Sequence, residues 1–193
     1  MSSLIPRATE ISHRLLALAV QEGDTVIDAT AGQGRDACFL AALVGESGRV
    51  WAFDVQEEAC RATRAALAEL GFLPRARVIR ADHAGLAAYD IEPAAAAIFN
   101  LGWLPGSDHT MVSGANTAAA LQAALHKLKI GGALVVVAYP GHEAGATEYA
   151  AVQNWLQSLP KKQARAMQIT FPLNEQAPVV LLIEKLNVIQ MRG

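Results

Sequence analysis

The chain has few cysteines, no marked excess of charge of either sign and no long apolar run. Its two cysteines, Cys38 and Cys60, cannot build a disulfide framework, and no Cys/His spacing resembles a zinc site. Sixteen basic and eighteen acidic side chains leave a net charge of −2, so no general positive charge marks a nucleic-acid-binding protein. We therefore expect a reduced, cytoplasmic protein without a metal, in which any RNA contact comes from a local patch.

Signals for secretion and membrane insertion are also missing. The segment MSSLIPRATEISHRLL lacks the basic end and continuous apolar run of a signal peptide. The strongly apolar stretches are shorter than the roughly 18–20 residues that a membrane helix needs. What the chain does have is 52% hydrophobic residues in 193, which suffices for one well-packed core. We expect a single domain, residues 1–193, with no membrane partner.

Short β-branched runs alternate with segments of helical periodicity. The expected strands are 25–29, 49–55, 76–82, 95–100, 133–140, 166–173 and 178–186. The expected helices are 8–20, one after the first glycine-rich loop, 57–70, 113–128 and 145–158. Such alternation is typical of a parallel sheet covered on both faces, and the short gap between the last two strands requires antiparallel pairing. The sequence predicts an α/β, Rossmann-like seven-stranded sheet, mostly parallel, with an antiparallel C-terminal hairpin and helices on both faces.

Two expectations concern individual helices. In segment 8–20, Ile11, Leu15 and Leu18 fall on one side, and this side is expected to face the core. Segment 113–128 is expected to bury Thr117, Leu121, Ala124, Leu125 and Leu128, and to end at Gly131-Gly132.

A glycine-rich loop, DATAGQGRDA (28–37), follows the first strand. Gly32 and Gly34 allow a tight turn and a close approach to a ligand, and the following helix start offers free N–H groups. Gly32-x-Gly34-x-x-Ala37 fits the dinucleotide fingerprint. Asp54, at the end of the second strand, can accept hydrogen bonds from a ribose diol. This arrangement suits NAD and S-adenosyl-L-methionine equally well.

Three features favour S-adenosyl-L-methionine over NAD. Asp28 precedes Gly32 by four residues, and a carboxylate there suits a cofactor with an ammonium group rather than a pyrophosphate. The terminal hairpin matches the seven-stranded methyltransferase sheet. A dehydrogenase usually needs a further substrate domain, and none is evident in this chain.

Further polar residues follow the strands where a cofactor binds in such sheets. Gln56 could contact the adenosine, and Asp82 could meet the adenine amino group. His83 could stack on the adenine, or it could be a solvent-exposed loop residue. Asp36 either contacts the methionine end of the cofactor or complements the positive helix start.

The fourth strand ends in Asn100-Leu101-Gly102-Trp103, where the transferable methyl group lies in such folds. Asn100 can accept a hydrogen bond from an amine N–H and direct the nitrogen lone pair, although it could also cap the strand end. Trp103 could stack on a base or could be a core or lid aromatic. His142, Asp108 and His109 could deprotonate an amine, but a loop role is commoner for such residues.

Several motifs together resemble a family of small stand-alone proteins labelled rRNA methylases. They are DATAGQGRDACFLA, FDVQ, FNLGWLPGSD, VVAYPGH and LNEQAP, and the resemblance extends over about residues 10 to 186. That family includes the bacterial tRNA 5-aminomethyl-2-thiouridine methyltransferase. The resemblance implies a class I methyltransferase that converts the aminomethyl group of a wobble uridine to methylaminomethyl. It also implies that Asn100 borders the acceptor and that the cofactor is held by Gln33, Asp36, Asp54, Gln56, Asp82 and His83.

Hypotheses of different classes remain open. The leading one is an S-adenosyl-L-methionine-dependent RNA N-methyltransferase with tRNA, bound at its anticodon region, as the partner. An rRNA or small-molecule methyltransferase with the same cofactor site is the first alternative. A NAD-dependent enzyme and a non-catalytic cofactor-binding protein follow, and a homodimer is left open.

Overall fold

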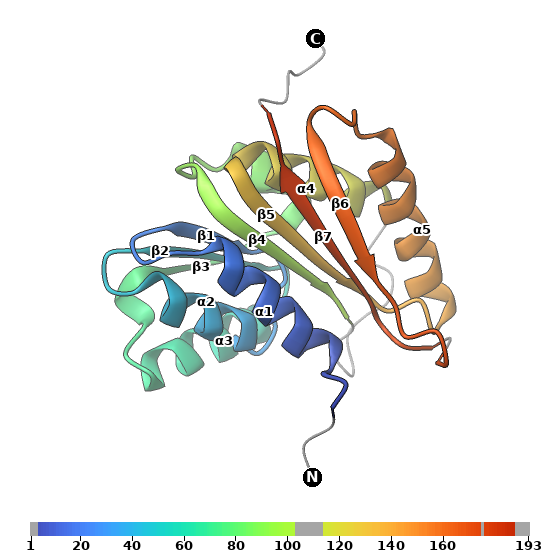
Figure 1. The fold of residues 1–193 in the computed structure, drawn as a ribbon. Helices are drawn as coiled ribbons and strands as arrows, with labels where there is room; N and C mark the ends of the chain where they lie inside the picture. Colours follow the sequence, from blue (N-terminus) through green and yellow to red (C-terminus); the bar gives the residue numbers. More distant parts are fainter. Residues whose placement is uncertain (1–3, 103–113, 175, 188–193) are drawn as a thin grey trace.

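A computed structural model describes residues 4–102, 114–174 and 176–187 (Figure 1). The strands are β1 Thr25–Asp28, β2 Arg49–Asp54, β3 Ala76–Arg80, β4 Ala94–Leu101, β5 Leu128–Ala138, β6 Ala164–Ile169 and β7 Val179–Lys185. The α-helices are α1 Ala8–Ala19, α2 Arg35–Val44, α3 Glu57–Glu69, α4 Gly114–Lys127 and α5 Glu143–Ser158, with short 3-10 turns η1 Leu73–Arg75 and η2 His83–Ala88. Each expected strand and helix is present, with ends shifted by a few residues.

The strands form one seven-stranded sheet in the order β3-β2-β1-β4-β5-β7-β6. The pairs β1–β2, β2–β3, β1–β4 and β4–β5 are parallel, whereas β7 pairs antiparallel with both β5 and β6. The predicted mixed sheet with an antiparallel C-terminal hairpin is therefore confirmed. The strand order reverses between β1 and β4, and this switch point opens a crevice at the carboxyl ends of the two strands.

Helices cover both faces of the sheet, and each face has its own core (Figure 1). On one face, Leu16 of α1 and Leu40 of α2 pack with strand residues such as Val26. On the other face, Leu121 of α4 packs against strand residues such as Phe99. Since alternate residues of a strand point to opposite faces, the central strands β1 and β4 contribute to both cores.

The expected buried side of α1 is confirmed in part, because Ile11 and Leu15 are partly buried and pack against the core, but Leu18 does not. The helix buries Ala8, Ser12 and Leu16, while Leu18 is 83% exposed. Ala8 and Ser12 are small, so this side of the helix can lie closer to the sheet than a side lined with leucines.

The helix expected at 113–128 is α4, which ends at Lys127, but the role expected of Gly131-Gly132 is wrong, because both glycines lie inside β5. The strand begins at Leu128 directly after α4, and its pairing with β4 shifts register between Ala94 and Ala96. A Cβ atom on Gly132 would lie 3.1 Å from the carbonyl oxygen of Ala94. Gly132 therefore allows two backbones to approach closely at an irregular part of the sheet, while Gly131 adopts a φ of +78° with open space around it. Thr117, Leu121, Ala124, Leu125 and Leu128 are buried as expected.

No helix in the described ranges is long and apolar enough to cross a membrane. The expectation of a single domain over residues 1–193 stays a prediction.

Candidate active site

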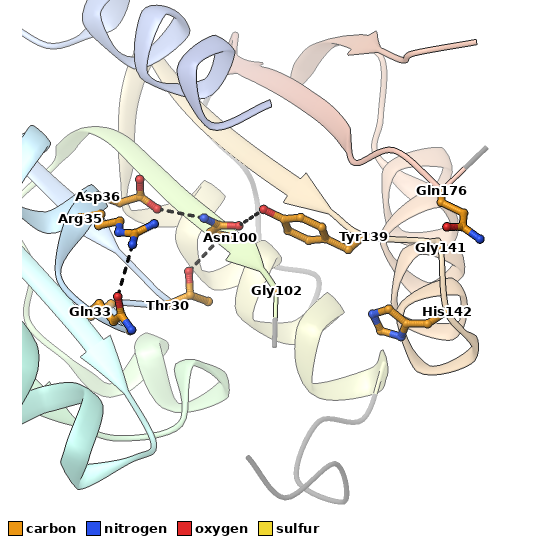
Figure 2. Close-up of a pocket in the computed structure, with 12 residues that line it drawn as sticks. Thr30, Gln33, Arg35, Asp36, Asn100, Gly102, Tyr139, Gly141, His142 and Gln176 are labelled. Atoms are coloured by element: carbon orange, nitrogen blue, oxygen red, sulfur yellow. Dashed lines mark hydrogen bonds between the residues drawn. The ribbon is translucent and has the colours of Figure 1, made fainter. Parts of the chain in front are cut away.

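A cavity of about 650 Å³ opens at the carboxyl ends of β1, β4 and β5. Its wall is made of residues from the loop after β1 and the start of α2, from the ends of β4 and β5 with the residues that follow them, and from the segment before β7: Thr30, Ala31, Gly32, Gln33, Arg35, Asp36, Asn100, Gly102, Tyr139, Gly141, His142 and Gln176 (Figure 2). The fold thus brings the glycine loop and Asn100 to the same cavity, although they are more than sixty residues apart in sequence. Gly32, Gln33, Asp36 and Asn100 are the predicted site residues that line it.

The glycine loop is held tightly against α3. Gly32 and Gly34 have φ angles of +52° and +82°, which favour glycine. A Cβ atom on Gly34 would lie 2.9 Å from the Cα atom of Thr63, and the Thr63 hydroxyl donates to the Gly32 carbonyl at 3.1 Å. A Cβ atom on Gly32 would have no neighbour closer than 3.8 Å. Gly34 therefore serves packing, whereas Gly32 leaves space open beside the cavity.

Asp54 ties the glycine loop to the end of β2. One carboxylate oxygen accepts a hydrogen bond from the Gly32 N–H at 2.9 Å, and the other accepts one from the Gln56 N–H at 2.9 Å. Each carboxylate oxygen has a second lone pair, so Asp54 can accept further donors.

Asn100 lies at the centre of a chain of hydrogen bonds (Figure 2). Its Nδ2 donates to Asp36 Oδ2 at 3.3 Å, and its Oδ1 accepts from the Tyr139 hydroxyl at 3.0 Å. Its backbone N–H donates to Thr30 Oγ1 at 2.8 Å. Burial and then the charge of Asp36 raise the pKa of Tyr139, so that its hydroxyl remains a donor at neutral pH. A donor on one side and a carboxylate on the other fix the orientation of the Asn100 amide.

Asp28 is fully buried behind the glycine loop and is not part of the wall of this cavity. Its Oδ1 accepts from the Thr30 N–H at 3.1 Å, while Oδ2 has no hydrogen-bond partner in the described part of the chain. Burial, and to a smaller extent the charges of Asp36 and Asp54, raises the pKa of Asp28 well above its ordinary value. Its predicted contact with a cofactor ammonium stays a prediction.

Gln56, Asp82 and His83 lie with Asp54 at the carboxyl ends of β2 and β3, outside the wall of this cavity. Asp82 Oδ1 accepts from the Ala84 N–H at 2.8 Å and caps η2. The His83 ring packs edge-on against Phe99, with centroids 5.7 Å apart. Burial lowers the pKa of His83 despite the opposing effect of Asp82 and Asp54, so the ring is neutral at pH 7. Its Nε2 is buried without a partner among the described residues.

Two residues that hold other side chains of the site had no role assigned from the sequence. His13 of α1 brings its Nε2 to 2.6 Å from Asp36 Oδ1, and Tyr139 holds Asn100. Tyr139 lies near the end of the fifth expected strand, 133–140, three residues before His142, so its position was a usable signal. Nothing in the spacing of His13 indicated its contact, because it depends on how α1 packs against α2.

His142 caps a helix in this structure. Its Nδ1 accepts from the Gly145 N–H at 3.0 Å at the start of α5, so this nitrogen's lone pair is engaged. This contact favours the loop interpretation over proton abstraction. Trp103, Asp108 and His109 lie outside the described residues. Within the described residues, no three His, Cys, Asp or Glu side chains are placed to hold a metal ion.

Polar groups that can match a methyltransferase cofactor lie at the carboxyl ends of β1, β2 and β3, both on the cavity wall and beyond it. Gly32 on the wall leaves open space, and beyond the wall Asp54 can accept further donors while Asp28 and His83 have buried polar atoms without a partner among the described residues. A ligand with amino, hydroxyl and adenine groups can match these features. Together with the sheet order, they define a Rossmann-like S-adenosyl-L-methionine-dependent methyltransferase. Within that class, the family described as "Putative rRNA methylase" matches residues 50–185, and the chain belongs to this family.

Similar proteins support this assignment. The chain is 31% identical over 192 residues to the chloroplastic tRNA (mnm(5)s(2)U34)-methyltransferase of Arabidopsis thaliana, covering 93% of this chain and 69% of that protein. A structure described as a putative rRNA-methylase from Clostridium thermocellum has a TM-score of 0.90 and 36% identity, covering 95% of this chain and all of the other. A Streptococcus mutans structure described as a putative methyltransferase in complex with SAH has a TM-score of 0.84 and 34% identity, with the same coverage. The cofactor of this chain is therefore S-adenosyl-L-methionine.

Proposed function

We propose that this chain is an RNA N-methyltransferase. Its substrate would be tRNA, in which it converts the aminomethyl group of a wobble 5-aminomethyl-2-thiouridine to methylaminomethyl. The name of the Arabidopsis relative supports the tRNA substrate, and the family description supports RNA more generally. We further propose that the reaction takes place in the cytoplasm.

The orientation of the Asn100 amide is the observation that carries this proposal. Asn100 lines the cavity at the end of β4, with Nδ2 toward Asp36 and Oδ1 toward Tyr139. The Tyr139 hydroxyl occupies one lone pair of Oδ1, and the second can accept an N–H from a substrate amine. An amide fixed in this way can orient an amine nitrogen without taking a proton from it.

The cofactor supplies an electrophilic methyl group on a sulfonium, and Asn100 would align the acceptor nitrogen with it. An alkyl amine is mostly protonated near pH 7, and its ammonium form has no lone pair for attack. Tyr139 remains a proton donor, and His142 Nδ1 is engaged by a backbone N–H. These residues therefore favour binding of the neutral amine over removal of its proton, and turnover should rise between about pH 6 and pH 8.

The remaining predicted residues would hold the cofactor along its length. Asp36, Gln33 and, from behind the loop, Asp28 would serve the methionine end. Asp54 would accept from the ribose hydroxyls. The adenosine end would lie near Gln56, Asp82 and His83.

The Asn100→Ala variant tests the proposed role of Asn100. It should lower the single-turnover rate on saturating aminomethyl-uridine tRNA by about a hundredfold, because the amine is no longer oriented. Its cofactor affinity by calorimetry should stay within about threefold of wild type, since the bond lost to Asp36 is long, at 3.3 Å, and His13 still holds the same carboxylate at 2.6 Å. A near-full single-turnover rate, or loss of cofactor binding in parallel with activity, would contradict this role.

The substrate is tested by mass spectrometry of tRNA nucleosides from cells that lack the protein. We expect the aminomethyl form to accumulate and the methylaminomethyl form to disappear. Unchanged tRNA with a methyl group lost from rRNA would favour the rRNA alternative. Unchanged nucleosides in both RNAs would favour a small-molecule acceptor.

A further inference from the structure

His13, on α1, makes a short polar contact with Asp36, which lines the cavity. The proposed chemistry assigns no role to α1. Its Nε2 lies 2.6 Å from Asp36 Oδ1, and the side chains of His13 and Asp36 are 27% and 9% exposed. The imidazole also stacks on Phe39, with ring centroids 3.9 Å apart and an angle of 5° between the rings. Phe39 lies one helical turn after Asp36 on α2. The stacked ring fixes the direction in which His13 presents its nitrogen.

Asp36 is held from two sides by residues of different elements. His13 of α1 contacts one carboxylate oxygen, and Asn100 of β4 donates to the other at 3.3 Å. Asp36 also lies in the first turn of α2, where the helix dipole favours a negative charge. Each carboxylate oxygen keeps a lone pair beyond these contacts, and Asp36 lines the cavity.

We infer that His13 is a positioning residue for the cofactor site. By donating to Asp36 Oδ1, it holds the carboxylate in the orientation that receives the methionine end of S-adenosyl-L-methionine. The inference rests on the proposed role of Asp36. The α1 helix, which otherwise only covers the sheet, thereby becomes part of the binding site.

Two variants separate this role from simple packing on Phe39. His13→Phe keeps a ring that can stack on Phe39 but removes the N–H donor. His13→Gln removes the ring but keeps a side-chain N–H donor that can reach Asp36. If His13 acts as a donor, the first variant should bind the cofactor poorly and the second should bind it well. If His13 only packs, the second variant should be the impaired one.

The experiment measures binding of SAH to the full chain by calorimetry, together with the unfolding temperature of each variant without ligand. SAH carries the same ammonium and carboxylate as the cofactor, and no RNA is needed. We expect His13→Phe to raise the dissociation constant about tenfold, the scale of a lost hydrogen bond to a charged group, and His13→Gln to stay within about threefold. Equal losses in both variants, an unchanged affinity in His13→Phe, or a loss only in His13→Gln would each overturn the inference.

Asp36→Asn, alone and combined with His13→Phe, shows whether His13 acts through Asp36. We expect Asp36→Asn to weaken SAH binding and the double variant to bind no more weakly than Asp36→Asn, because coupled residues are non-additive. Additive losses would overturn the role of His13 and leave the role of Asp36 standing. An unchanged affinity in Asp36→Asn would instead refute the proposed cofactor contact on which the inference rests.

Discussion

Single residues at this site combine a structural task with a functional one, and Asp28 shows the conflict most clearly. It is fully buried with an unpartnered Oδ2, and burial followed by the charges of Asp36 and Asp54 raises its pKa. An ionised carboxylate in this position destabilises the fold unless a ligand compensates it. The proposed contact of Asp28 with the cofactor would offset this cost when the cofactor is bound.

Asp28→Asn should therefore increase the free energy of unfolding of the ligand-free protein near pH 8. Because the folded pKa lies above the unfolded one, Asp28 favours folding below its unfolded pKa, and this contribution is lost as pH rises through the folded pKa. The advantage of the variant should thus shrink as pH falls toward about pH 5, as measured by urea unfolding. The exposed Asp90→Asn is the matched control, and an advantage that grows on acidification would contradict the raised pKa of Asp28.

Tyr139→Phe tests whether the orientation of the Asn100 amide matters for turnover. The variant removes the hydroxyl that donates to Asn100 Oδ1 and keeps the ring beside Gly102. We expect kcat to fall about tenfold, the scale of one hydrogen bond, with cofactor affinity within about twofold. Tyr149→Phe is the control, because its hydroxyl donates to Gln168 on β6. Equal kcat values for the two variants would show that Tyr139 does not orient Asn100.

At the scale of elements, the packing of α2 against α3 sets the shape of the glycine loop. Gly34→Ala would place a Cβ atom 2.9 Å from the Thr63 Cα atom at a φ of +82°. Gly71→Ala, after α3, meets a similar φ of +72° with no atom within 4 Å. We expect a loss of about 1 kcal/mol in unfolding free energy for Gly71→Ala from backbone strain alone. Gly34→Ala should lose about 1–3 kcal/mol more from overpacking.

Chemical denaturation of both variants measures this difference. Similar losses in the two variants would mean that strain alone, and not contact with α3, requires glycine at position 34. The same comparison with SAH present reports whether the altered loop still binds the cofactor.

The whole molecule should be most stable at the centre of its sheet. β4 is buried along nearly all its length, whereas β6 lies at the edge, pairs with β7, and is exposed at residues 165–168. We expect strand amides of β4 and β5 to exchange with solvent at least about a hundredfold more slowly than those of β6 in native-state hydrogen exchange. Faster exchange in β4 than in β6 would contradict this order of stability.

The sequence by itself determined the architecture and the cofactor class. Alternating strand and helix patterns are local properties, and the loop 28–37 carries its glycines and acids at fixed spacing, so both could be predicted without coordinates. The antiparallel hairpin followed from a gap too short for a crossover helix. Asn100 could be placed at the end of a strand, and the structure shows it on the cavity wall.

Only the tertiary structure decided which groups meet. α1 is rotated so that Ser12 is buried and Leu18 is exposed, and this rotation brings His13 to Asp36. The rotation depends on how closely small side chains let a helix approach its neighbours. The bond from Tyr139 to Asn100 joins residues on β4 and the end of β5 whose alignment is set by register, including the shift between Ala94 and Ala96. Contacts of this kind arise between segments far apart in sequence, and periodicity within one segment carries no information about them.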